Sequence, residues 1–252
     1  MTTKIVLIVE YDGTRYHGFQ WQANAPTIQA KLEDALAKMT SHPVRIYGAS
    51  RTDSGTHAKG QVVSFGTSAT FSAETWMRAL NFYLPEDIAV RDAYEVDESF
   101  DVRRHATSRE YAYTILNRPS RSPLRSRFAH LVQQPLHIDL MNEACQVLVG
   151  EYDFAAFTFF VPGRTVRTVF DARVRQESDL VVFEIIANSF LPYQVRNTVG
   201  ALMRVGLGKL KVEDFAKLAR SKQAGAVGPA APARGLCLMK VNYPDFPPRG
   251  RC

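Results

Sequence analysis

A short polar turn holds the residues of this sequence that are best suited to chemistry. Arg51, Asp53 and His57 place a guanidinium, a carboxylate and an imidazole within seven residues. A neighbouring arginine favours the ionised form of a carboxyl group, because its positive charge stabilises the anion. An ionised carboxylate in a cleft can act as a nucleophile or as a base. Asp53 is therefore the candidate catalytic residue.

Three other interpretations of this turn are open from the residues alone. Asp53-Ser54-Gly55-Thr56 matches the D-[ST]-G-[ST] signature of aspartic proteases, but that all-β fold needs two such aspartates, and the chain has no second copy. Ser54 and His57 could form a hydrolase pair, although the strand-turn-helix context of G-x-S-x-G is missing. All four residue types also favour turns, so the segment could simply join two strands.

The positive charge of the chain is concentrated in one stretch. The 252 residues carry a formal net charge of +6, from 31 Lys and Arg against 25 Asp and Glu. Between Val102 and Ile138 Glu110 is the sole acid, and the basic residues are Arg103, Arg104, Arg109, Arg118, Arg121, Arg125 and Arg127. Arginine suits bidentate phosphate contacts and base stacking. The stretch predicts a footprint for a nucleic-acid backbone, and a solvated basic loop is the alternative.

The composition is that of a soluble globular protein, with 46% hydrophobic and 22% charged residues. The aliphatic run at 5–9 is far too short to span a membrane, and no signal peptide is recognisable at the start. The three cysteines are widely spaced and fit neither a disulfide scaffold nor a zinc site. We expect a cytoplasmic protein without a metal.

The hydrophobic pattern predicts the order β-α-β-β-α-β twice. In the first half, strands are expected at 5–11, 44–49, 61–65 and 88–96, with helices capped by Thr27 and Ser72. In the second half, strands are expected at 109–116, 171–176, 180–187 and 236–241, with helices at 139–149, closed by Gly150, and at 192–205. This order predicts an α+β fold of two similar units, 1–104 and 105–252, with antiparallel or mixed sheets joined side by side and helices on one face.

The polar turn and six other blocks together resemble the tRNA pseudouridine synthase A family. The blocks lie in the family's order at 11–29, 81–90, 100–113, 165–168, 188–200 and 231–238. There are departures, because Ser50, Ser54 and Thr56 stand where the family usually has Gly, Ala and Val. Glycine alone adopts a positive φ without strain, so Ser50 raises a question about the turn. Pro192-Tyr193-Gln194 replaces the usual His-His-Met.

The resemblance implies the pseudouridine synthase fold and an isomerase that converts uridines at positions 38, 39 and 40 of the tRNA anticodon stem-loop. It implies no metal or redox cofactor, and a homodimer with tRNA spanning both subunits. The competing class is a tRNA-binding module that has lost catalysis. The joint presence of Arg51, Asp53, Tyr111 and Arg196 argues against that alternative.

The resemblance also implies a role for each matching residue. Asp53 is the nucleophile or base, and Arg196 is the charged partner that keeps it ionised. Arg51 takes the space of the extruded base, and Tyr111 stacks on the uracil. Without the resemblance, Arg196 could be a surface ion pair and Tyr111 a half-buried strand residue. From the charge pattern, Arg103, Arg109, Arg121, Arg125 and Arg127 are expected to bind RNA.

Overall fold

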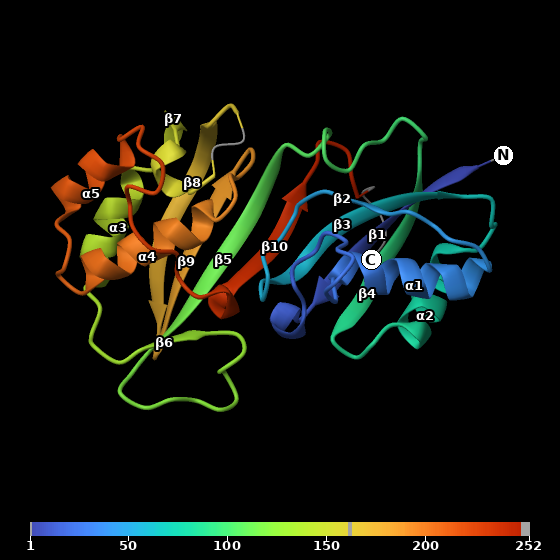
Figure 1. The fold of residues 1–252 in the computed structure, drawn as a ribbon, viewed down its shortest axis with the longest axis horizontal. Coiled ribbons are helices and arrows are strands. Elements are labelled where there is room, and N and C mark those ends of the chain that lie inside the picture. The colour runs from blue at the N-terminus through green and yellow to red at the C-terminus, as the bar shows by residue number, and fades with distance from the viewer. Residues whose placement is uncertain (1, 161–162, 248–252) are drawn as a thin grey trace. The chain divides into compact units, whose positions relative to one another are not determined.

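The computed structural model describes residues 2–160 and 163–247, which fold as two units (Figure 1). One unit contains the residues up to Thr107 together with those from Leu238 onward, and the other contains Ser108–Cys237. The structure is α+β, as expected, and it has five α-helices within the described ranges. No helix in those ranges is long and apolar enough to cross a membrane.

The first unit is built on strands of which most run antiparallel to their neighbours. Its strands are β1 (Thr3–Tyr11), β2 (Tyr47–Gly48), β3 (His57–Thr67), β4 (Ile88–Val96) and β10 (Leu236–Asn242). They have the order β4-β1-β3-β10, with β2 beside β3, and β1 is antiparallel to both β3 and β4. The residues of β10 from Leu238 therefore return to the first unit, whereas the sequence-based division places them in the second.

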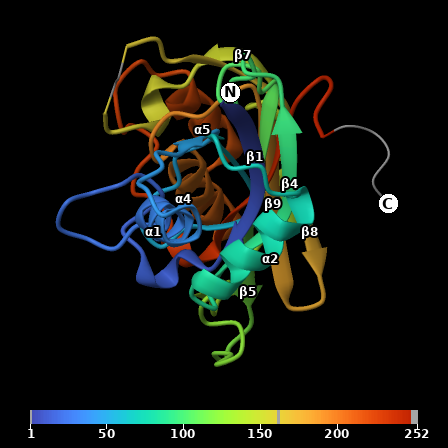
Figure 2. The same cartoon turned by 90° about the vertical axis from the view of Figure 1, so that its right-hand side faces the viewer.

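The helices of the first unit begin at the residues that the sequence indicates. They are α1 (Ile28–Thr40) and α2 (Ala73–Tyr83), and they cover one face of the strands (Figures 1 and 2). Thr27 and Ser72 accept hydrogen bonds at the two N-termini through their side chains, which satisfies a backbone donor of each first turn. Buried apolar residues then fix α1 and α2 against the sheet.

The second unit contains a largely antiparallel sheet with helices on one face (Figure 1). Its strands are β5 (Ser108–Asn117), β6 (His130–Val132), β7 (Gly150–Asp153), β8 (Val166–Glu177) and β9 (Leu180–Ala187). The order is β5-β9-β8-β7, and β6 pairs in parallel with β5. The helices are α3 (Ile138–Gln146), α4 (Gln194–Gly206) and α5 (Val212–Ala219).

Several elements differ from the sequence-based expectation. The strand expected at 44–49 is reduced to β2, because only Tyr47 and Gly48 pair with β3. Gly150 does have a positive φ of 123°, but it begins β7 and does not close α3, which ends at Gln146. The helix expected from 192 begins at Gln194, because Tyr193 is left-handed at its N-cap. The elements β6, β7 and α5 were not expected.

The order of elements supports the expected pattern in one unit more closely than in the other. The first unit follows β-α-β-β-α-β from β1 to β4. The second unit inserts β6 before its first helix, β7 after it, and α5 after α4. That the two units are similar copies therefore stays a prediction.

Candidate active site

Asp53 lies on a tight turn just before β3. The amide of Thr56 donates to the Asp53 carbonyl at 3.1 Å, and Gly55, the third residue of the turn, has a φ of +74°. A positive φ at this position is typical of a type II turn and favours glycine. Thr52 is buried, whereas Arg51 is exposed and Asp53 is half-buried. The side chains of Arg51 and Asp53 therefore face away from the core in which Thr52 is buried.

The backbone of this turn is held from both sides by residues 11–20. The amide of Phe19 donates to the Thr52 carbonyl at 3.1 Å, and the amide of Gly55 donates to the Tyr16 carbonyl at 3.1 Å. These two bonds grip the chain immediately before and after Asp53. A side-chain bond of 2.8 Å between Tyr11 Oη and Thr52 Oγ1 adds a buried contact. The sequence block at 11–29 therefore supports the turn that carries Asp53.

Two glycines allow the close approach of these segments. A Cβ on Gly13 would lie 2.0 Å from the carbonyl oxygen of Thr56. A Cβ on Gly18, whose φ is +91°, would lie 2.8 Å from the carbonyl oxygen of Thr52. Both obstacles are backbone atoms, so a rotamer change cannot relieve them. Only glycine fits at these positions without moving the Asp53 turn.

Ser50 is held by a buried side-chain amide and shows no backbone strain. Gln61 is fully buried; its Oε1 accepts from the Ser50 amide at 3.2 Å and its Nε2 donates to the Ser50 carbonyl at 2.7 Å. Ser50 is not among the described residues with a positive φ. The serine at the family's usual glycine position therefore does not force this part of the turn into a strained conformation.

His57 joins the turn to residues 11–20. Its side chain is 5% exposed, and its Nδ1 accepts from the amide of Gly13 at 3.1 Å. Asp12 Oδ1 lies 3.2 Å from the same Nδ1 and accepts from the amide of Thr14 at 2.9 Å. This geometry gives His57 a structural position in the turn.

In the second unit, Tyr111 and Arg109 follow one face of β5. Tyr111 is 7% exposed and packs edge-on against Phe190, with ring centroids 5.1 Å apart and planes at 86°. Arg109 is equally buried, and its Nη1 donates to the Asn188 carbonyl at 2.7 Å. This bond fixes the guanidinium beside β9, so Arg109 is the least accessible of the arginines expected to bind RNA.

Tyr113 lies on the same face of β5, deeper in the unit. Its hydroxyl donates to the Pro232 carbonyl at 2.8 Å, and burial raises the pKa of this phenol well above its usual value. Tyr113 therefore stays protonated and acts as a buried donor. Of Arg109, Tyr111 and Tyr113, which lie on this face, Tyr113 is fully enclosed.

Arg196 lies near the start of α4, on the side away from its apolar stripe. As expected, Val195, Val199 and Leu202 are buried, whereas Arg196 is half-buried. Its Nε donates to the Ala231 carbonyl at 2.8 Å, and its own carbonyl accepts from the Ala231 amide at 2.9 Å. The guanidinium carbon also lies 5.2 Å from the centre of the Tyr193 ring. These contacts fix the orientation of the guanidinium.

The arginine loop, residues 118–128, is tied to the turn between β8 and β9. Arg118 Nη1 and Arg125 Nη1 contact the two oxygens of Asp179, at 2.9 and 2.7 Å. The hydrogen bond from Arg125 and the charges of both arginines hold the pKa of Asp179 below its ordinary value. Arg121 and Arg127 are exposed. RNA binding by these arginines stays a prediction.

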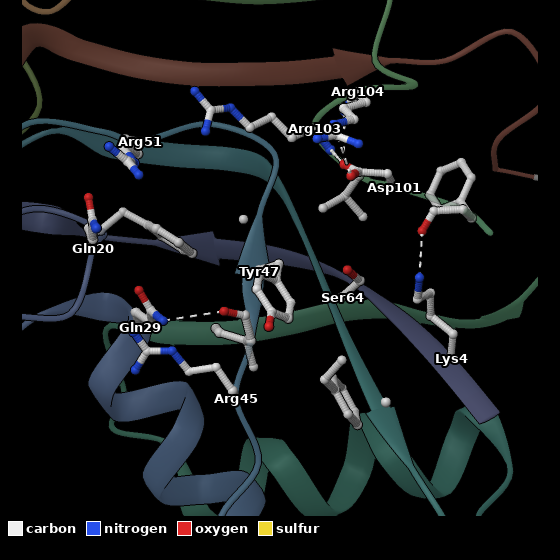
Figure 3. A pocket seen from close by; sticks show the side chains of 17 residues that line it. Lys4, Gln20, Gln29, Arg45, Tyr47, Arg51, Ser64, Asp101, Arg103 and Arg104 are labelled. Carbon is white, nitrogen blue, oxygen red and sulfur yellow. Dashed lines mark hydrogen bonds and ion pairs between the residues drawn. The ribbon is translucent and has the colours of Figure 1, made fainter. Parts of the chain in front are cut away.

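A pocket of about 560 Å³ lies in the first unit, beside the Asp53 turn (Figure 3). Arg51 and Arg103, which the sequence indicated, both line it. Lys4, Arg45 and Tyr47 also line it, and the sequence analysis did not single them out, because no local pattern indicates that their side chains share a pocket. Among the described residues there is no cluster of three or more His, Cys, Asp or Glu side chains that could hold a metal.

Comparison with known proteins gives a consistent result over nearly the whole chain. Residues 7–103 and 144–244 match the family model described as tRNA pseudouridine synthase. A tRNA pseudouridine synthase A of Thermoanaerobacter sp. (strain X514) is 42% identical over 241 residues, 95% of this chain and 99% of that protein. The enzyme of the same name from Exiguobacterium sp. is 41% identical over 243 residues, 95% of this chain and 98% of that protein. The chain belongs to the tRNA pseudouridine synthase family.

Proposed function

We propose that this protein isomerises uridine to pseudouridine at positions 38, 39 and 40 of the tRNA anticodon stem-loop, with Asp53 as the nucleophile or base. Membership of the family makes it an isomerase that acts on tRNA. The positions, a homodimeric state and a cytoplasmic location rest on the resemblance of the sequence blocks. The observation that supports Asp53 is its turn, which is gripped by backbone hydrogen bonds on both sides.

The proposed reaction needs one well-placed carboxylate. The bond between uracil N1 and ribose C1′ breaks, the base rotates, and a bond forms between C5 and C1′. The C5 proton is released and N1 gains a proton, so the product is an isomer. Asp53 either attacks C1′ or removes a proton from the sugar, and both routes require the ionised carboxylate. A turn fixed by Tyr16 and Phe19 provides the positional accuracy that such chemistry requires.

Three further residues take supporting roles in this proposal. The exposed Arg51 occupies the space that the target base leaves when it is extruded. Tyr111 stacks on the extruded uracil, with Phe190 packed against the edge of its ring system. In this proposal Arg196 supplies positive charge to the carboxylate, and its bond to Ala231 holds the guanidinium in one orientation.

Replacement of the carboxylate tests the proposal directly. Tritium release from tRNA labelled with [5-³H]uridine reports the reaction, because the C5 hydrogen is lost when C5 bonds to C1′. We expect Asp53→Asn to lower release by at least about 100-fold, the smallest loss typical of removing a positioned acid-base group, and to leave tRNA binding intact. Asp92→Asn, an exposed aspartate of β4, is the matched control.

A second assay, nucleoside analysis, separates an enzyme from a tRNA-binding module. Nucleoside analysis of an anticodon stem-loop incubated with the wild-type protein should show pseudouridine at the expected positions. Binding without product would favour the module. Normal turnover by Asp53→Asn would remove Asp53 from the mechanism while leaving the family's activity in place.

A further inference from the structure

The pocket beside the Asp53 turn has the features of a second nucleotide site. We call it the basic pocket, and its cationic lining residues are Lys4, Arg45, Arg51, Arg103 and Arg104. Among the described residues, Asp101 is the one carboxylate that lines it. A volume of about 560 Å³ falls within the range of roughly 300–1,000 Å³ that is usual for small-ligand sites. An excess of positive charge in a space of this size favours a small anionic ligand.

The Asp101 carboxylate in the basic pocket already accepts hydrogen bonds from backbone amides of its own loop. Asp101 Oδ1 accepts from the amides of Arg103 and Arg104 at 2.8 and 2.9 Å. These bonds hold the pKa of Asp101 below its ordinary value and shape the loop that carries both arginines. The ammonium of Lys4 donates to the carbonyls of Glu98 and Phe100, which fastens the same loop to β1. Asp101 thus positions the loop that carries Arg103 and Arg104 at the edge of the basic pocket.

Arg45 and Arg104 keep donors for a phosphate group. The Arg104 side chain is 87% exposed, and its Nε lies 3.8 Å from Asp101. One Nη of Arg45 lies 3.3 Å from Glu33, and its side chain is 56% exposed. Because a guanidinium has five N–H donors in a planar fork, a single partner leaves most of them available. Phosphate oxygens match that fork better than any neutral ligand does.

An exposed aromatic ring completes the site. Tyr47 is 67% exposed, and in the view of Figure 3 it lies between Arg45 below and Arg51, Arg103 and Arg104 above. A ring in this position offers a stacking surface for a planar base. Gln20 and Ser64 also line the pocket and can hydrogen-bond the edge of a base. Phosphate, base stacking and edge contacts together describe a nucleotide.

We propose that the basic pocket binds the nucleotide next to the target uridine in the RNA, with its phosphate on the arginines and its base against Tyr47. This inference rests on the proposed function. Arg51 connects the two sites, because it lines the pocket and lies two residues before Asp53. An occupant that reaches Arg51 is therefore close to the target in the strand.

A comparison of altered protein with altered RNA tests the stacking contact. Tyr47→Ala should raise the KM for a stem-loop substrate by about 5- to 20-fold, within the range of losing one base-aromatic stack, with little change in kcat. A stem-loop with an abasic nucleotide beside the target, on the 5′ or the 3′ side, should lose as much affinity with the wild-type enzyme. Combining the variant with the correct abasic RNA should then cause no further loss.

Matched variants separate this site from general charge and folding effects. Phe82→Ala removes a ring that is 81% exposed on α2, and Arg78→Ala removes an exposed arginine of the same helix; neither residue lines the pocket. Arg104→Ala should weaken RNA binding and lower its dependence on salt, whereas Arg78→Ala should not. Equal effects of both arginine variants would overturn the assignment.

The outcomes distinguish this inference from the proposed function. Wild-type turnover with an unchanged KM for Tyr47→Ala, or additive losses in the combined experiment, would overturn the nucleotide site alone. Free uridine or adenosine monophosphate that competes with the stem-loop at micromolar concentration would instead indicate a small-molecule site. If the wild-type protein forms no pseudouridine, the proposed function fails, and fluorescence anisotropy with the same RNAs and variants still decides whether the pocket binds a nucleotide.

Discussion

The Asp53 turn and the arginine loop are both polar segments between strands, but they are supported in different ways. The Asp53 turn, residues 51–57, is bound by backbone amides and carbonyls of residues 11–20 and by the buried Gln61 amide. The arginine loop, residues 118–128, is tied to Asp179 through two partly exposed ion pairs and to Gln133 through the Pro119 carbonyl, and it contains short local turns. Backbone hydrogen bonds hold the first segment, whereas bonds from side chains, two of them in ion pairs, hold the second.

This difference matches what each segment is proposed to do. A carboxylate that must meet one sugar carbon requires accurate placement, and an error of about 1 Å can cost roughly 100-fold in rate. Arginines that follow an RNA backbone need charge and reach more than a fixed position. Asp179 can give up the more exposed Arg125 to a phosphate, because exposed ion pairs contribute little to stability.

The largest effect is expected where the support of the Asp53 turn is broken. Gly13→Ala would place a Cβ 2.0 Å from the Thr56 carbonyl oxygen, so either residues 11–20 or the turn must move. We expect a loss of about 1–3 kcal/mol in the free energy of unfolding, typical of overpacking, and a fall of roughly 100-fold in kcat. Denaturant unfolding and tritium release measure the two quantities.

Gly66→Ala is the control, because a Cβ at this position of β3 would meet no atom within 4 Å. Its stability should remain close to that of the wild type. If Gly13→Ala also left both quantities unchanged, the rigid support described for the Asp53 turn would be disproved, and the contrast with the arginine loop would disappear.

A smaller effect is expected where the arginine loop is released. Asp179→Asn removes the charge shared by Arg118 and Arg125. Amide hydrogen exchange in residues 118–128 should accelerate by about 2- to 5-fold, as expected for weak exposed pairs, while exchange at the Asp53 turn stays the same. Glu177→Gln is the control, since Glu177 pairs with Arg175 in the same hairpin. Equal acceleration in both variants would contradict anchoring by Asp179.

Local signals made much of the fold predictable from the sequence. The caps Thr27 and Ser72 and the apolar spacing after them predicted α1 and α2, and the start of each is confirmed. The strand expected at 88–96 is β4. By contrast, α5 has only eight residues, and Phe215 packs in an edge contact with Phe157 from a distant segment. Such a short helix depends on tertiary packing that no local pattern reports.

The sequence indicated which residues form the candidate site but not the contacts that hold them. The role of Asp53 stays a prediction, and the two hydrogen bonds from Gln61 to Ser50 depend on how β3 folds back beside the turn. The run of arginines indicated charge, but it could not show that Arg109 is buried or that Arg125 pairs with Asp179. The net charge can be counted from the sequence, but the accessibility of each arginine depends on the residues that it contacts elsewhere in the chain.

The smallest effect concerns the pH at which the arginine loop loses its anchor. The pKa of Asp179 is lowered in the folded protein, first by the hydrogen bond from Arg125. A carboxyl group with a depressed folded pKa stabilises the native state above its unfolded pKa, about 3.9, and this contribution is lost as pH falls through the lower folded value. The ¹³C shift of the Asp179 carboxyl should therefore titrate below 3.9, and Arg125→Gln should move its midpoint upward. A wild-type midpoint at or above 3.9 would show that the arginines do not hold this carboxylate, and the loop would then need another anchor.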